Sequence, residues 1–366
     1  MTLKLMTSKK NICLFTSVDW FILSHREDFL LQLSNTSEKI SVIVFEDTGA
    51  LSKKYPDVEV IDLNSNRSDT SIFTLFKVVR TVIKTIRRLK IDLVWTVSMK
   101  PCFVMLVSES FISSKVIYTI SGLGTLYNTS NYRFGIARFL FEFLVKKTES
   151  KIIVQNYEDY ELFKKIRDFR IYLVQGSGVE LHKYRRVKPN IRVEKVVFVG
   201  RTLISKGIMD FIWLSEQFKD TDIVFDIYGD SDDNLDSINV SDIQLNKFNS
   251  NLTYHGKIDH IEDVLPSASV IVLPSIREGL SLTLCEAAAS GLAILTYDVA
   301  GCREVCNHGI NGYASAVNDK TDLANNLRRI INDPDILLMF SEASLRISKK
   351  FDKSSINNQL LSILNE

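Results

Sequence analysis

The stretch Leu273-Pro-Ser-Ile-Arg-Glu-Gly-Leu-Ser-Leu-Thr-Leu-Cys-Glu286 decides how this chain is interpreted. An apolar run at 270–273 predicts a buried strand, and apolar residues at helical spacing predict a helix over about 280–290. Two carboxylates, Glu278 and Glu286, lie eight residues apart across this strand-to-helix turn. Taken alone, each of them could equally be a solvated surface carboxylate.

The turn also predicts an anion site. The first amides of a helix have no partner within the helix, and the helix dipole adds positive potential there. We expect the amides near Gly279 to Ser281 to be unpaired and to point beyond the carboxyl end of the strand. Orphan amides beside two carboxylates suit a phosphorylated sugar, because the amides attract phosphate and carboxylates accept from hydroxyls.

The composition predicts a globular protein with two domains. The chain has 366 residues, 45% of them apolar and 24% charged, which is long for a single core. Its five cysteines are odd in number and lack a metal-type spacing, so we expect free thiols in a reducing compartment. The apolar run at 12–18 is too short for the core of a signal peptide and is expected to be the first strand. These features favour a cytoplasmic location.

The charge is distributed unevenly. Residues 1–185 hold 27 Lys and Arg against 19 Asp and Glu, whereas the remainder holds 18 against 25. Two segments of the basic half, 76–88 and 132–147, combine basic and apolar or aromatic residues at helical spacing. Such helices suit an anionic membrane surface, although ordinary packing of their apolar faces on a sheet explains them too. Without a recognition motif or a strongly basic domain, no nucleic-acid partner is expected.

Strand-like and helical segments alternate throughout, which predicts α/β architecture with two doubly wound parallel sheets. The seam between the two series is expected in the polar stretch 183–192. The predicted strands of the first series are 11–16, 40–45, 58–61, 93–96, 116–119, 152–154 and 171–174, and those of the second are 196–200, 223–228, 252–256, 270–273 and 293–297.

The first turn of the second series carries two cations. Gly200-Arg-Thr-Leu-Ile-Ser-Lys-Gly207 follows a predicted buried strand, so Arg201 and Lys206 are expected near the carboxyl end of the sheet. Two cations there would suit a diphosphate. Alone, a loop lysine and arginine could equally be solvated.

Together these motifs resemble the retaining glycosyltransferases of family four. The resemblance rests on 200–207, Tyr254-His-Gly-Lys257, the stretch 274–291, and Gly301-Cys-Arg-Glu304 with Gly309-Ile-Asn-Gly-Tyr313, and it is most specific over about 195–330. It implies the GT-B fold, two facing Rossmann-like domains with a cleft between them. We accordingly expect an acceptor-binding, membrane-facing domain over 1–187, a nucleotide-sugar-binding domain over 188–345, and a C-terminal helix over 346–366 that crosses back.

The resemblance also implies roles for individual residues. Arg201 and Lys206 would bind the donor diphosphate and neutralise the leaving group, and Glu278 would hold hydroxyls of the transferred sugar. Glu286 would accept from the ribose, and the backbone around His255 to Ile258 would read the uracil. The implied catalytic residues are Arg201, Lys206 and Glu278, and the implied donor-binding residues are Gly200, His255, Lys257, Ile258, Gly279, Leu280, Ser281 and Glu286.

The first half resembles bacterial capsule and O-antigen transferases that use UDP-sugars, through Asp19-Trp-Phe-Ile-Leu-Ser-His-Arg26 and Tyr118-Thr-Ile-Ser-Gly-Leu-Gly124. Many relatives carry a histidine where this chain has Ser121, so a histidine-assisted variant is not expected. His25 has either a substrate role or a capping and packing role. The implied acceptor or cleft residues are His25, Arg26, Ser121, Gly122 and Gly124.

Two motifs suggest metal chemistry. Asp230-Ser-Asp232 resembles the acid-x-acid signal of metal-dependent transferases, but its context favours a solvated loop. Cys302 and Cys306 open a predicted helix without partners and are expected to be structural. We therefore predict no metal site and no cofactor.

The resemblance implies that one hexose or N-acetylhexosamine moves from a UDP-sugar to a polyprenyl-diphosphate-linked glycan in O-antigen or capsule synthesis. A protein with that acceptor is expected to be peripheral on the inner face of the cell membrane. The alternatives are a UDP-sugar epimerase of the same fold and a non-catalytic, donor-binding partner of another transferase.

Overall fold

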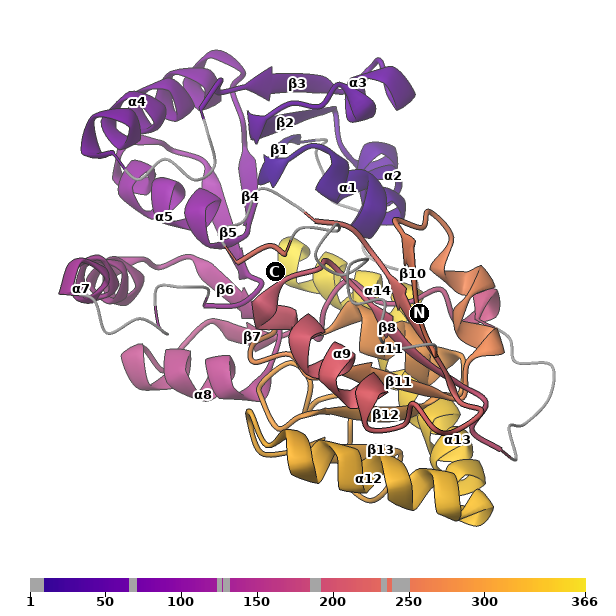
Figure 1. Cartoon of the computed structure of the whole chain (residues 1–366). Helices are drawn as coiled ribbons and strands as arrows, with labels where there is room; N and C mark the ends of the chain where they lie inside the picture. Colours follow the sequence, from indigo (N-terminus) through magenta and orange to yellow (C-terminus); the bar gives the residue numbers. More distant parts are fainter. Residues whose placement is uncertain are drawn as a thin grey trace. The chain divides into compact units, whose positions relative to one another are not determined.

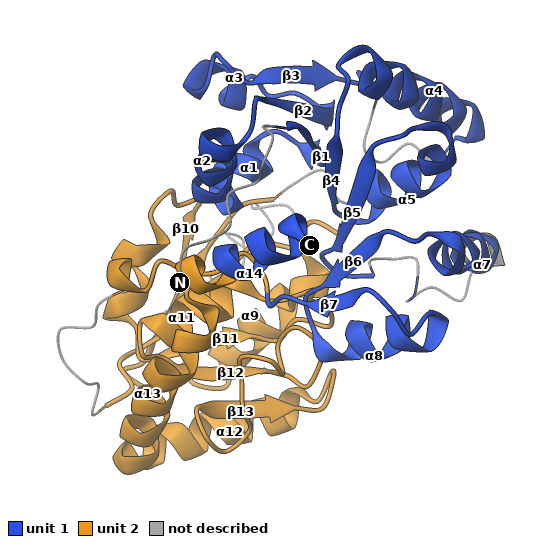
Figure 2. Cartoon of the chain, turned by 180° about the vertical axis from the view of Figure 1, so that it is seen from behind, with its two compact units in different colours: residues 1–175, 357–366 blue, residues 176–356 orange. Residues whose placement is uncertain are grey.

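The computed structural model describes residues 10–65, 71–123, 127, 132–184, 192–231, 236–238 and 251–366. It divides into two compact units, residues 1–175 with 357–366 and residues 176–356 (Figure 2). The division at Gln175 precedes the expected seam at 183–192. Residues 357–366 belong to unit 1, whereas the C-terminal segment was expected to start at 346.

Unit 1 is built on a parallel sheet in the order β3-β2-β1-β4-β5-β6-β7. The central strands are buried along their length, because helices cover both faces (Figure 1). Its strands are β1 Asn11–Val18, β2 Lys39–Glu46, β3 Glu59–Asp62, β4 Leu93–Val97, β5 Lys115–Ile120, β6 Lys151–Val154 and β7 Ile171–Leu173.

The helices of unit 1 form two layers. Helices α4, α5, α7 and α8 lie on one face of the sheet and α1 and α2 on the other, as both views show (Figures 1 and 2). The bounds are α1 Trp20–His25, α2 Glu27–Thr36, α3 Ala50–Lys54, α4 Ile72–Arg88, α5 Met99–Ser108, α7 Tyr132–Lys147 and α8 Tyr157–Ile166. Helix α14, Lys353–Asn365, starts in unit 2 and continues in unit 1.

Unit 2 contains a second parallel sheet, in the order β10-β9-β8-β11-β12-β13. Helix α9 packs with α12, and α11 packs with α13 (Figure 1). The elements are β8 Lys195–Val199, α9 Ile208–Glu216, β9 Val224–Tyr228, β10 Leu252–Gly256, β11 Val270–Leu273, α11 Leu282–Ala289, β12 Ala293–Tyr297, β13 Gly312–Ser315, α12 Lys320–Asn332 and α13 Pro334–Ser348.

These two sheets confirm the predicted architecture. The strand order of unit 2 reverses at β8 and β11, which are parallel neighbours: β9 and β10 are added on one side of β8, and β11 to β13 on the other. Such a reversal of strand order is the point where open α/β sheets bind ligands. Strand β13 was missed, because a four-residue segment beginning with Gly312 carries no run of apolar residues.

In the described part of the chain, no helix is both long enough and apolar enough to cross a membrane.

Candidate functional site

The loop after β8 and the loop after β11 are locked together at the reversal point. Gly207 starts α9 with a left-handed φ of 78°, and a Cβ there would lie 2.2 Å from the carbonyl oxygen of Pro274. The carbonyl of Ser205 accepts from the Ile276 amide at 3.0 Å and from the Ser275 hydroxyl at 3.1 Å. The loop that carries Lys206 and the loop that carries Glu278 are thereby held against one another.

Lys206 and Glu278 form an ion pair across these two loops. Lys206 ends the 3₁₀ helix Ile204–Lys206, and its Nζ contacts Oε1 of Glu278 directly. The exposed fractions of the two side chains are 21% and 9%, so water screens the pair poorly. Arg201, the second predicted cation, is exposed in the loop that follows β8. The structure thus joins a cation and a carboxylate that the sequence analysis had treated separately.

A third loop supports this pair from the side of β12. Gly301 has a φ of 80°, and a Cβ there would lie 2.6 Å from Cβ of Glu278. The Gly301 amide donates to Oε2 of Glu304 at 2.6 Å, which holds the turn in place. The Gly301 carbonyl accepts from the Ser281 amide at 3.0 Å. The 301–304 turn therefore positions both Glu278 and the start of α11.

The expectation that the Ser281 amide is unpaired is wrong, because it donates to Gly301. Ser281 is instead the N-cap of α11, and its hydroxyl accepts from the Leu284 amide at 3.4 Å. By helix geometry, the first-turn amides of Leu282 and Thr283 cannot bond within the helix. The helix dipole and these two amides keep an anion-binding character at this end of α11.

Glu286 lies one helical turn further, half-buried on α11. Its Oε1 accepts from the hydroxyl of Tyr184 at 2.9 Å. Burial raises the pKa of the Glu286 carboxyl to about 7; the Tyr184 hydrogen bond opposes this shift, and the charge of Glu262 adds to it. Close to neutral pH this carboxyl can therefore exist in either protonation state.

We expect Glu286→Gln to change how stability depends on pH. Between pH values of about 4.5 and 7 the folded protein keeps a proton on Glu286 that the unfolded chain has lost, so the wild type loses stability as the pH rises. Gln cannot titrate, so the melting temperature of the variant should gain on that of the wild type from about pH 5 to about pH 8. Thermal unfolding at several pH values measures this, with the exposed Glu216→Gln as control. A difference that stays constant with pH would contradict the raised pKa.

The side chain of His255 contacts two side chains of the neighbouring strand β9. Its Nε2 lies 2.9 Å from Oδ1 of the buried Asp226, and its ring stacks on Tyr228 with centroids 4.5 Å apart. Lys257 is exposed and lies 3.9 Å from Asp259, and Ile258 packs against the core. The uracil contact was predicted for the backbone of residues 255–258, and it stays a prediction.

The predicted acceptor residues follow β1 and β5 in unit 1. Arg26 is only 2% exposed, its guanidinium lies 5.6 Å from the ring centroid of Trp95, and burial lowers its pKa to about 10. His25 packs its ring edge-on against Phe21 at 5.1 Å. Ser121 and Gly122 are half-buried after β5. Gly124 lies outside the described residues.

Two motifs had suggested metal chemistry. Asp230 Oδ1 accepts from the Ser231 amide at 2.8 Å, and Asp232 lies outside the described residues. Cys302 and Cys306 are buried, and burial raises the pKa of both thiols. Over the described ranges, no three His, Cys, Asp or Glu side chains gather as metal ligands would.

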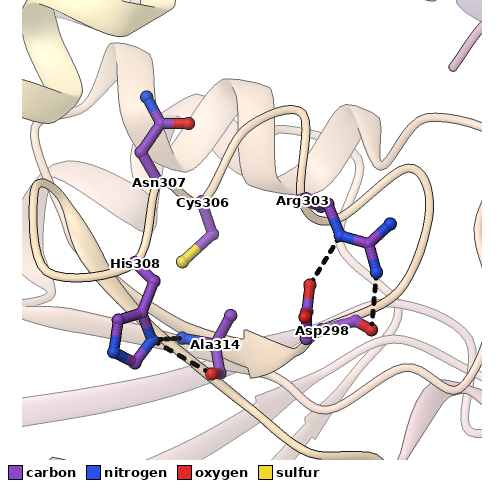
Figure 3. A pocket seen from close by; sticks show the side chains of 6 residues that line it. All are labelled: Asp298, Arg303, Cys306, Asn307, His308 and Ala314. Carbon is purple, nitrogen blue, oxygen red and sulfur yellow. Dashed lines mark hydrogen bonds and ion pairs between the residues drawn. The ribbon is translucent and has the colours of Figure 1, made fainter. Parts of the chain in front are cut away.

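A pocket of about 300 Å³ lies beside the 301–304 turn (Figure 3). Arg303 Nε lies 2.6 Å from Oδ1 of Asp298, and Nδ1 of His308 lies 3.1 Å from the carbonyl oxygen of Ala314. No motif in the sequence predicted this pocket. Its charged pair is satisfied internally, so the pocket gives no argument for a ligand.

Two consecutive units, each with a parallel sheet, are the architecture of the GT-B class of α/β proteins, and the second unit carries a cation–carboxylate pair where its strand order reverses. Residues 193–333 match the model of the group 1 glycosyl transferases, and residues 11–156 match that of glycosyl transferase 4-like domains. The chain belongs to this family of glycosyltransferases.

Two of the relatives are bacterial glycosyltransferases. The chain is 22% identical to the N,N'-diacetylbacillosaminyl-diphospho-undecaprenol alpha-1,3-N-acetylgalactosaminyltransferase of Campylobacter jejuni, over 92% of this chain and 94% of that protein. It is 23% identical to the UDP-Gal:alpha-D-GlcNAc-diphosphoundecaprenol alpha-1,3-galactosyltransferase of Escherichia coli, over 74% of each.

Solved structures share the fold. Sucrose-phosphate synthase from Thermosynechococcus elongatus superposes with a TM-score of 0.80 at 17% identity and covers 98% of both chains. HepE from Anabaena, in complex with UDP and glucose, has a TM-score of 0.77 at 16% identity over 98% of this chain and 100% of that one. At these identities the likeness concerns the fold, which is GT-B.

Proposed function

We propose that this glycosyltransferase moves a hexose or N-acetylhexosamine from a UDP-sugar to a polyprenyl-diphosphate-linked glycan, with retention of anomeric configuration, in the synthesis of a surface polysaccharide. The observation that carries the proposal is the Lys206–Glu278 pair at the point where the strand order of unit 2 reverses. The names of the Campylobacter and Escherichia relatives, which act on undecaprenyl-diphosphate glycans, support the choice of acceptor.

The two side chains of the pair suit the two groups of a nucleotide-sugar that flank the bond that breaks, the diphosphate and the sugar. An ammonium group attracts the diphosphate, and an ionised carboxylate accepts hydrogen bonds from sugar hydroxyls. These two moieties are joined through the anomeric carbon and the departing oxygen, so a cation in contact with a carboxylate suits both at once. The first-turn amides of Leu282 and Thr283 would add positive potential on the phosphate side. Glu286, in its ionised form, would accept from the ribose diol.

We propose that Lys206, Arg201 and the start of α11 carry out leaving-group stabilisation without a metal ion. Negative charge develops on the UDP oxygen as the glycosidic bond breaks, and fixed cations stabilise it most where water is scarce. In a retaining transfer on one face, that oxygen accepts the proton of the attacking hydroxyl while the new bond forms. Such a route requires no separate base, so Glu278 does not have to take a proton and can hold the sugar hydroxyls.

The acceptor determines where in the cell the enzyme must act. A glycan on a polyprenyl diphosphate stays in the membrane, so the enzyme that extends it must reach the membrane surface. We propose peripheral attachment at the inner face of the cell membrane, where nucleotide-sugars are available. His25, Arg26, Ser121, Gly122 and Gly124 remain predicted acceptor residues of unit 1.

Purified protein incubated with a panel of UDP-sugars and a lipid extract that holds polyprenyl-linked glycans tests the proposal. We expect transfer with an excess of chelator, an α-linked product, and stabilisation by UDP of roughly 2.7 kcal/mol at about 100 times its dissociation constant. The linkage of the product is read by nuclear magnetic resonance.

Each part of the proposal has its own contrary result. If no UDP-sugar of the panel supported transfer, UDP-sugars would be excluded as donors. A β-linked product would exclude retention. Activity that chelator removes and a divalent ion restores would revive Asp230 and Asp232 as metal ligands. Turnover of the UDP-sugar without any acceptor would favour an epimerase.

A further inference from the structure

Helix α4 buries one face and exposes a stripe of a different character on the other. Phe73 is followed on the exposed side by four cations at spacings of four and three residues, which places them on one line along the helix. Phe73 and Phe76 are 84% and 72% exposed, so these two aromatic side chains do not pack on the sheet. The buried residues are Val78, Val79, Val82, Thr85 and Ile86, and the exposed cations are Lys77, Arg80, Lys84 and Arg87.

Helix α7 repeats this order. Its exposed apolar side chains precede two lysines and have exposed fractions from 42% at Leu140 to 72% at Phe139. The exposed Arg138 lies among these apolar residues, with its Nε 3.6 Å from Oε1 of Glu142. The Nζ of Lys147 lies 5.6 Å from the ring centroid of Phe143, so cation and aromatic ring are adjacent. The exposed apolar residues are Ile136, Phe139, Leu140 and Phe143, and the lysines are Lys146 and Lys147.

The two helices lie in one layer. Helix α5 contacts both α4 and α7, and all three lie on the same face of the sheet (Figures 1 and 2). Each of α4 and α7 connects two parallel strands and therefore runs antiparallel to them. Their first turns consequently lie at the carboxyl edge of the sheet, the edge where open α/β sheets bind ligands. Apolar ends and cationic ends thus coincide on one surface.

We propose that the exposed faces of α4 and α7 dock unit 1 on an anionic membrane surface. The exposed aromatic and aliphatic side chains of the two helices enter the boundary between headgroups and acyl chains, and the exposed cations contact lipid phosphates. This proposal names the membrane partner of the function proposed above and rests on it. A second copy of the chain is a poorer occupant, because a symmetric contact would bring these cationic stripes against one another.

Co-sedimentation of the full chain with vesicles tests the proposal. We expect binding to vesicles that contain phosphatidylglycerol, weaker binding to phosphatidylcholine alone, and release at high salt. Phe73→Ser with Phe76→Ser should lower the partition coefficient more than about tenfold. Arg80→Ser with Lys84→Ser should lower it by about fivefold for each cation removed. Val317→Ser with Met339→Ser removes exposed apolar side chains of unit 2 and should have no effect.

Stabilisation by UDP, measured on every variant, separates docking from donor binding. Loss of vesicle binding with unchanged stabilisation by UDP supports the proposal. Equal sedimentation of wild type and both α4 variants, or equal binding to neutral and anionic vesicles, overturns it. So does a wild-type dimer that the Phe73 and Phe76 changes dissociate, since a second copy then covers this surface. Vesicle binding that depends on α4 in a protein that never binds UDP supports docking and rejects the proposed function instead.

Discussion

Lys206→Ala is expected to lower the rate of sugar transfer by roughly 10²–10³-fold, the usual cost of removing one group aimed at developing charge. The change acts twice, because the variant loses the cation for the diphosphate and leaves Glu278, with 9% of its side chain exposed, without its ion-pair partner. The second effect should cost about 2 kcal/mol of stability. Initial rates with saturating donor, together with thermal unfolding, measure the two effects separately.

The control for Lys206→Ala is Lys219→Ala, which removes an exposed lysine of the same unit. A second variant separates structure from chemistry. Replacing both partners, Lys206→Met with Glu278→Leu, removes the unpaired charge and should recover most of the stability while transfer stays low. If Lys206→Ala transferred sugar at the wild-type rate, the pair would have a structural role only.

The architecture could be predicted because it follows from local patterns. Runs such as 270–273 and 293–297 are mostly apolar, have a Pro or Gly at or near one end, and became β11 and β12. Lys206 follows a predicted strand, and all strands of a parallel sheet end at its carboxyl edge. The topology alone therefore predicted that Lys206 lies near the site. The spacing of apolar residues and the Pro and Gly near the ends of each segment predict a strand or a helix from about ten residues of sequence.

Contacts between separate loops could not be predicted in this way. The pairing of Lys206 with Glu278 joins positions 72 residues apart, and the hydrogen bond from Ser281 to Gly301 uses an amide that helix rules leave open. Helix α4 shows the same limit at the level of packing. Its apolar residues exceed what one buried face can hold, and only the tertiary structure decides that Phe73 and Phe76 are the ones outside.

Gly207→Ala is expected to damage both stability and donor binding, and Gly309→Ala supplies a matched control. Both glycines have a left-handed φ, 78° and 74°, so both variants bear the cost of a Cβ in that conformation, about 1 kcal/mol. They differ in space, since a Cβ at Gly309 meets nothing within 4 Å, whereas one at Gly207 would lie 2.2 Å from the Pro274 carbonyl oxygen. The clash must displace the loop after β11.

The displacement caused by Gly207→Ala should add about 1–3 kcal/mol to the loss of stability, as overpacking does elsewhere. It should also weaken stabilisation by UDP, because Lys206 precedes Gly207 and Glu278 lies in the loop that moves. Thermal unfolding of both variants, with and without UDP, measures the two effects against Gly309→Ala. Equal losses in the two variants would mean that the β11 loop yields freely, and a rigid junction between the loops would then not be what holds the cation and the carboxylate together.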